Sequence, residues 1–245
     1  CPCGRERPTA GKRQNPDTKI NYQSIHMKKL AFVSLFLLCA AMASAQVTPL
    51  NRVNPMIGTS KMGHVFPGAC VPHGIVALSP DTDTIPHNID GVYQPRANEY
   101  CAGNQYKDST IVGFSHTHFS GTGHSDLGDF LIMPTTGTLK LNPGTQQDPD
   151  DGYRSRFNHD SETARPGYYS VFLEDYGVKV ELTATERTGM HRYTYAKDAK
   201  DPRFILDLNH GIYNYDGKTL WANLRVENDT TLTGYRSTNG WARPH

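Results

Sequence analysis

The sequence predicts an all-β protein, an antiparallel β-sandwich, on three observations. Glycine and proline are frequent, with 22 and 16 of the 245 residues, so turns must recur along the chain. Apolar and polar residues alternate over 178–185, with Val178, Val180, Leu182 and Ala184 on one side, as a strand with one buried face requires. No stretch beyond residue 46 keeps a 3.6-residue apolar period, so helices are not expected to build the core.

Residues 27–45 have the order of a secretory signal peptide. A basic pair follows Met27, an apolar run extends over 30–42, and Ala43-Ser44-Ala45 supplies the small residues that signal peptidase accepts. We therefore predict cleavage after Ala45 and an exported protein, periplasmic or extracellular. The apolar run is shorter than the roughly 20 residues that cross a bilayer, so no membrane span is expected.

The predicted signal peptide also sets the domain boundaries. Residues 1–26 precede it and are predicted to be a mis-called upstream extension, which leaves 46–245 for the sandwich domain. Beyond residue 45 there are two cysteines, Cys70 and Cys101, and either a disulfide or two separate thiols is consistent with an exported protein. The net charge of +1 provides no basic field for nucleic acid.

Short strands and turns are expected throughout the rest of the chain. Glycine and proline punctuate 53–80 and indicate short strands joined by tight turns, whereas 81–106 is polar, without periodicity, and is predicted to run over the surface. Further strands are expected at 130–133, 178–185, 191–195 and 204–209, and a hairpin at 224–226 and 231–233 around the turn Asn228-Asp229-Thr230.

Residues 113–129 carry most of the chemistry in the sequence. Three histidines, two carboxylates, several hydroxyl residues and four glycines fall within this segment. A metal site is one interpretation, with His116 and His118 on one side of an extended chain and His124 and Asp126 nearby, although the spacing matches no closed zinc pattern. A sugar-binding loop and a turn whose polar side chains cap its own backbone are the other two.

Two catalytic arrangements do not fit this segment. Gly121-Thr122-Gly123 lacks the serine and the strand–turn–helix context of a nucleophile elbow. Asp126 and Asp129 lie three residues apart on one segment, whereas the carboxyl pair of an inverting glycosidase comes from separate elements about 6.5–9.5 Å apart. The sequence contains no complete catalytic set.

The segment, with motifs on both sides of it, resembles the N-terminal domain of glycoside hydrolase family 92. The matching motifs are collinear over roughly 50–241: 53–59, 66–69, 78–82, 113–123 with 126–129, 166–171, 181–185 and 191–193. One departure is that no Trp precedes Cys101, where the family often has an aromatic that selects the linkage, so the linkage stays open.

The resemblance implies a calcium-dependent, inverting exo-α-mannosidase. In that family an N-terminal β-sandwich of the galactose-mutarotase-like supersandwich type packs with an (α/α)6 barrel. The barrel supplies most or all of the catalytic acid, base and calcium ligands. None of those residues has a counterpart here, so no catalytic residue and no metal ligand is assigned. The sandwich contributes one wall of the substrate cleft, which the matching motif places at His116, His118, Ser120, Gly121, Thr122, Gly123 and Asp126.

The chain is therefore predicted to be an incomplete sandwich, the N-terminal part of an exported enzyme that trims α-linked mannose from glycans. It is expected to be inactive alone, because the barrel is absent. Two other functions stay open from the residues themselves. One is a non-catalytic carbohydrate-binding β-sandwich module, and the other is a metal hydrolase built on the histidine cluster.

Overall fold

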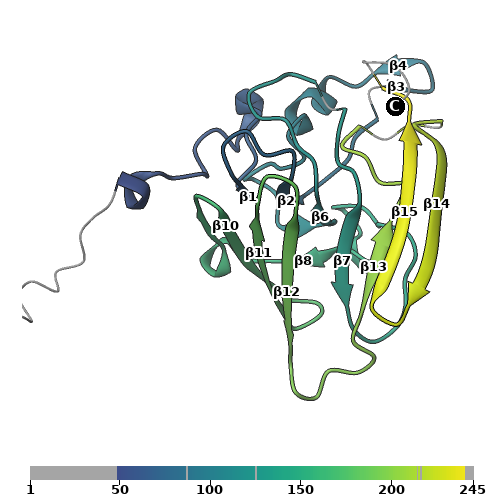
Figure 1. The fold of residues 1–245 in the computed structure, drawn as a ribbon. Helices are drawn as coiled ribbons and strands as arrows, with labels where there is room; N and C mark the ends of the chain where they lie inside the picture. Colours follow the sequence, from purple (N-terminus) through teal and green to yellow (C-terminus); the bar gives the residue numbers. More distant parts are fainter. Residues whose placement is uncertain (1–48, 87, 125, 214, 216, 241–245) are drawn as a thin grey trace, which may run out of the picture. The chain divides into compact units, whose positions relative to one another are not determined.

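The computed structural model describes residues 49–240 except 87, 125, 214 and 216, all within one compact unit, Thr48–His245 (Figure 1). The predicted signal peptide and the predicted upstream extension lie outside these residues. The described strands form two main sheets, in which neighbouring strands are antiparallel, and three two-stranded ribbons. The prediction of an antiparallel β-sandwich is confirmed, and the helical segments in this part of the chain are all short 3-10 turns.

The five-stranded sheet has the order β1-β2-β6-β7-β13 and the four-stranded sheet has the order β12-β11-β10-β9. The bounds of the first sheet are β1 Ala69–Cys70, β2 Ala77–Asp81, β6 Gly113–Ser115, β7 Leu131–Thr135 and β13 Arg203–Asp207. Those of the second are β12 Gly189–Tyr195, β11 Val178–Ala184, β10 Tyr168–Leu173 and β9 Thr163–Arg165.

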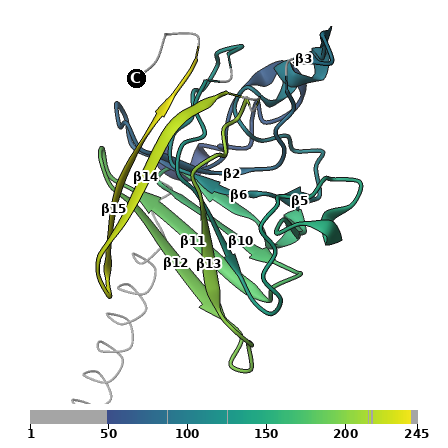
Figure 2. The ribbon, with the colours of Figure 1, turned by 90° about the vertical axis from the view of Figure 1, so that its right-hand side faces the viewer.

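Three ribbons and five 3-10 turns complete the described fold. The ribbons pair β3 (Asn88–Ile89) with β4 (Val92–Tyr93), β5 (Thr110–Ile111) with β8 (Ser155–Arg156), and β14 (Thr219–Asn228) with β15 (Thr231–Thr238). The turns are η1 Pro49–Arg52, η2 Lys61–Gly63, η3 Pro95–Tyr100, η4 Pro149–Asp151 and η5 His159–Ser161. Figure 2 shows the long β14–β15 hairpin alongside β13, and apolar residues of all three strands line one hollow.

The core lies between the two sheets. Val178, Val180 and Leu182 of β11 are buried, and they alternate with the exposed Lys179 and the partly exposed Glu181, as the pattern predicted. β11 packs against β1 and β2, and its side chains join those of the five-stranded sheet in one apolar cluster. Burying one such side chain contributes about 1.5–3 kcal/mol, so this strand is a main source of the stability of the sandwich.

The expected hairpin is also confirmed and is longer than the sequence indicated. β14 ends at Asn228 and β15 begins at Thr231, with the two-residue turn between them. The Asn228 side chain accepts a hydrogen bond from the Thr230 backbone amide at 2.9 Å, which explains this residue in the turn.

The prediction of a surface excursion over 81–106 is wrong for its second half. Residues from Ala97 to Gln105 are largely buried, with Tyr100 completely so. The Tyr100 hydroxyl has an internal partner: it donates to Asp108 at 3.1 Å, and Thr82 donates to the other oxygen of that carboxylate at 2.7 Å. Partners distant in sequence offset the cost of burial, and a local polarity pattern cannot reveal them.

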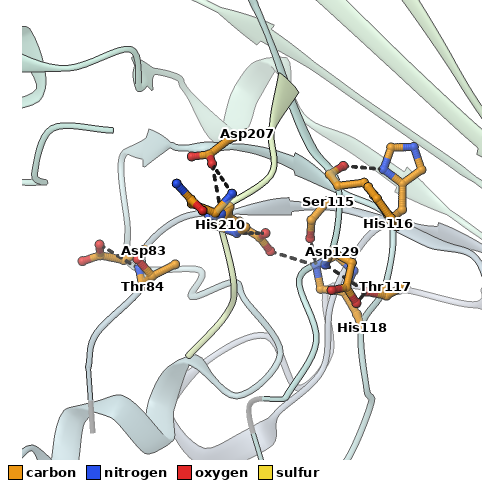
Figure 3. Close-up of polar contacts among 12 residues, drawn as sticks. Asp83, Thr84, Ser115, His116, Thr117, His118, Asp129, Asp207 and His210 are labelled. Carbon is orange, nitrogen blue, oxygen red and sulfur yellow. Dashed lines mark hydrogen bonds and ion pairs between the residues drawn. The ribbon is translucent and has the colours of Figure 1, made fainter. Parts of the chain in front are cut away.

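Asp81, the last residue of β2, is the centre of a buried polar cluster. Its Oδ1 lies 2.8 Å from His118 Nε2, and its Oδ2 lies 2.7 Å from His210 Nε2. The side chains of Asp81 and His118 are completely inaccessible to solvent. Figure 3 shows His118 and His210 approaching from two different segments, so one carboxylate joins β2 to the loop after β6 and to the segment after β13.

The two ring nitrogens of His118 both face oxygen atoms. Its Nδ1 lies 2.7 Å from the Ala77 carbonyl, and its Nε2 lies 2.8 Å from the Asp81 carboxylate. The ring therefore connects two points of β2 in the interior. Burial by itself raises the pKa of the Asp81 carboxyl, but His118 and His210 outweigh burial and hold that pKa well below its usual value.

Gly103 makes room for this cluster. Its φ is +78°, a left-handed conformation that glycine adopts without strain, and a β-carbon there would collide with Asp81 Oδ1. The Thr82 amide donates to the Gly103 carbonyl at 2.8 Å, which holds the turn against the end of β2.

We predict that Asp81→Asn lowers the free energy of unfolding by about 3–5 kcal/mol, because it removes the buried carboxylate to which two histidines are bonded. Asp90→Asn is the matched control, since Asp90 is exposed and asparagine tolerates its φ of +52°. Urea unfolding of both variants measures the difference. Equal stabilities of the two variants would contradict the role of Asp81.

The Asp81 carboxylate is expected to make a contribution to the free energy of unfolding that is lost in acid. Because its pKa is lowered on folding, that contribution is present above the unfolded value near pH 4 and is lost as the pH falls towards the folded value. The stability difference between the unaltered chain and Asp81→Asn should shrink from pH 5 to pH 3; a constant difference would refute the assignment.

Candidate functional site

The predicted substrate-wall residues lie in the loop between β6 and β7, and its base is rigid. The His116 amide donates to the Asp129 carbonyl and the Gly128 amide to the Thr117 carbonyl, each at 2.9 Å. Thr117 Oγ1 donates to Asp129 Oδ2 at 2.7 Å and accepts from the Asp129 amide at 3.0 Å. These bonds extend the pairing of β6 with β7 and close the base, so residues 118–127 form a defined loop.

The tip of this loop faces solvent. Ser120, Gly121, Thr122 and Gly123 are all exposed, as is the aromatic ring of Phe119 next to them. The Gly121 amide donates to the His64 carbonyl at 2.6 Å, and the φ of Gly121 is +75° with open space where a side chain would be. The tip therefore presents hydroxyl groups and an aromatic ring on a backbone that is fixed at both ends, an arrangement suited to a polyhydroxyl ligand.

Both carboxylates of the loop are neutralised by cations from the C-terminal hairpin region. Lys218 is buried, and its Nζ lies 3.0 Å from Asp126 Oδ1 and 3.0 Å from the Asp126 carbonyl. Arg236 lies 3.1 Å from Asp129 Oδ1 and also donates to the carbonyl of His210 at 2.6 Å. Asp126 and Asp129 thus fix the shape of the loop, and neither is placed as a free acid or base at the tip.

The two histidines nearest in sequence point to different partners. His118 binds Asp81 in the interior, with Ser115 Oγ 3.1 Å from its Nε2. His116 Nδ1 donates to the Phe130 carbonyl at 2.6 Å, while its Nε2 lies 3.2 Å from Nε2 of His191, on β12 of the other sheet. The rings of His116 and His118 therefore share no hydrogen-bond partner among the described residues, and a metal site built on the pair stays a prediction.

The His116–His191 pair continues to a tyrosine. Tyr193 Oη lies 2.8 Å from His191 Nδ1, so three side chains form a chain of hydrogen bonds that ends on Phe130. Burial lowers the pKa of His116, and burial together with His116 lowers the pKa of His191 to about 3. Both imidazoles are neutral at pH 7 as a result.

The structure thus divides the seven predicted wall residues into two groups. Ser120 to Gly123 form the exposed tip, where they are accessible to a ligand. His116, His118 and Asp126 bond to other parts of the domain and position the tip. For all seven residues, a role in substrate binding stays a prediction. Lys218, Arg236 and His191 were missed, since nothing near them in the sequence marks them as partners of this loop.

The calcium that the family resemblance implies stays a prediction. Within 49–240, apart from the four gaps, no three His, Cys, Asp or Glu side chains are grouped so that they could hold one metal ion. Cys70 and Cys101 are both free thiols rather than a disulfide. No helix in this part of the chain is long and apolar enough to cross a membrane.

Comparison with known proteins places this geometry in a family. Residues 52–245 match the model of the glycosyl hydrolase family 92 N-terminal domain. The structure of the family GH92 α-mannosidase BT3965 from Bacteroides thetaiotaomicron, in complex with mannoimidazole, is similar with a TM-score of 0.71 and 45% identity over 80% of this chain. The GH92 family glycosyl hydrolase ccman5 gives a TM-score of 0.59 and 25% identity over 77%.

A curated relative agrees with these structures. An uncharacterized secreted glycosidase of Arthroderma benhamiae is 30% identical over 173 residues, 65% of this chain. This chain spans 24% of each of the two solved structures and 20% of that relative. The match to the family model covers both sheets and the loop between β6 and β7, and on that ground the chain belongs to glycosyl hydrolase family 92, whose N-terminal domain it carries.

Proposed function

We propose that this chain is the substrate-cleft domain of an exported, inverting exo-α-mannosidase that removes α-linked mannose from glycans. The observation that carries the proposal is the similarity, at 45% identity over 80% of this chain, to an α-mannosidase whose structure holds mannoimidazole. Export is supported by the leader-like segment at 27–45 and by a relative described as secreted.

The loop between β6 and β7 is the surface that we assign to the cleft. Its tip offers the hydroxyls of Ser120 and Thr122, the amides around two glycines and the ring of Phe119, all exposed. Hydroxyl and amide groups pair well with sugar hydroxyls, and an aromatic ring packs on the apolar face of a pyranose. The rigid base keeps these groups in place before a sugar binds, which lowers the entropic cost of binding.

The same loop supports the proposal that the domain alone is inactive. An inverting glycosidase needs one protonated and one ionised carboxyl group facing each other across the bond, about 6.5–9.5 Å apart. The carboxylates next to the tip, Asp126 and Asp129, are paired with Lys218 and Arg236. On this proposal the catalytic acid and base, and the calcium ligands, come from the rest of the enzyme, for which the family's (α/α)6 barrel is the candidate.

The first test is activity with and without the sequence that follows in the gene. We expect the coding sequence carried past residue 245 to yield an enzyme that releases mannose from α-linked mannobiose with inversion, followed by NMR of the anomeric proton. Chelation should abolish that activity and calcium should restore it. Residues 46–245 alone should release none. Glycan binding by that fragment, with no hydrolase encoded downstream, would instead establish a binding module.

The second test addresses the loop tip. In the active enzyme, Thr122→Ala should lower kcat/KM about 3- to 10-fold, the worth of one hydrogen bond to a sugar hydroxyl, and leave the melting temperature unchanged. Thr138→Ala is the matched control, because Thr138 is exposed beyond the opposite end of β7. If the two variants have the same kcat/KM, the tip is not part of the cleft.

A further inference from the structure

His116 and His191 bring two imidazoles together from the two sheets. His116 follows β6 in the five-stranded sheet, and His191 lies on β12, the edge of the four-stranded sheet. Their Nε2 atoms are 3.2 Å apart, with the ring centroids 4.9 Å apart and the rings inclined by 35°. We infer that this pair is a binding site for a borderline transition-metal dication, zinc being the representative ion, that links the two sheets.

The separation of the two nitrogens suits a shared metal ion. Zinc binds an imidazole nitrogen at about 2.0–2.1 Å, so two nitrogens 3.2 Å apart subtend about 100° at the ion, close to the tetrahedral angle. The rings approach with their nitrogens foremost, since the Nε2 atoms are closer than the ring centroids. An ion can therefore reach both nitrogens without a shift of the backbone.

The other nitrogen of each ring is already held. His116 Nδ1 lies 2.6 Å from the Phe130 carbonyl, and His191 Nδ1 lies 2.8 Å from Tyr193 Oη. Metal-bound histidines almost always have such an oxygen partner on the second nitrogen, which orients the ring. Because the carbonyl can only accept, His116 carries its proton on Nδ1 and directs the lone pair of Nε2 towards His191.

Tyr193 allows the pair to exist with or without an ion. In the absence of metal the hydroxyl donates to His191 Nδ1, and His191 Nε2–H donates to His116. When a cation binds, the hydroxyl can instead accept from Nδ1–H, which leaves a lone pair on both Nε2 atoms. Only hydrogen positions change between the two states.

The surroundings select the kind of ion. Two neutral imidazoles favour zinc, nickel or copper, whereas calcium requires oxygen ligands. Both histidines are partly exposed residues, which leaves a route for an ion and its waters. Within the described residues no group of three His, Cys, Asp or Glu surrounds this point, so water must complete the coordination. The site is thus distinct from the calcium dependence proposed for the whole enzyme.

The test is zinc binding and thermal stability of the full chain, freed of metal with a chelator that is then removed. Zinc chloride in excess should bind with one ion per chain in calorimetry and should raise the melting temperature by about 2–4 °C, while calcium chloride should not. His191→Asn and His116→Asn should lose both effects. His73→Asn is the matched control, since His73 is exposed and asparagine accepts its φ of +61°.

Tyr193→Phe keeps both proposed ligands and tests their orientation if the histidine variants fail to fold. It should weaken zinc binding about 10- to 100-fold, the usual effect of losing an outer-shell partner. The proposal is overturned if zinc leaves the unaltered chain unchanged, if His191→Asn keeps the zinc effect, or if Tyr193→Phe binds zinc with the same affinity.

Discussion

The buried carboxylate of Asp81 is the constraint on which the rest of the domain depends. A charge with no access to solvent is tolerated only when it is compensated, and here His118 and His210 supply the compensation. Those partners lie in the loop after β6 and in the segment after β13, so a local electrostatic requirement determines where two distant parts of the chain must lie. The conformation of Gly103 follows from it, because Asp81 occupies the space of a side chain there.

The loop between β6 and β7 is rich in glycine, yet its conformation is held by contacts with the rest of the domain. Its glycines permit the turn at the tip, but its base is fixed by Thr117 and Asp129 and its carboxylates are paired with Lys218 and Arg236. The groups that hold the exposed tip are therefore themselves buried or partly buried. Fixed groups lose less entropy on binding a ligand than mobile ones do, so this construction would favour the sugar-binding role that we propose for the tip.

The sequence predicted the sandwich well because its signals were local. The alternation at 178–185 places Val178, Val180 and Leu182 in the core, and the turn after Asn228 places the hairpin. Burial of 97–105 could not be predicted, since it depends on Asp108 and Thr82 satisfying polar groups across other segments. The same limit applies to the candidate site: the loop was found from its composition, but the partner of His116 lies 75 residues further on.

The pairing of the loop with Lys218 and Arg236 has a consequence for folding. In the chain, residues 116–130 precede by about 100 positions the cations at 218 and 236 that neutralise Asp126 and Asp129. Until the hairpin is made, the loop has two carboxylates without their partners, and its final conformation is not yet the favoured one. Contacts of such long sequence separation form late and slowly. The loop is thus expected to reach its final conformation only after the hairpin has formed, although its residues lie near the middle of the chain.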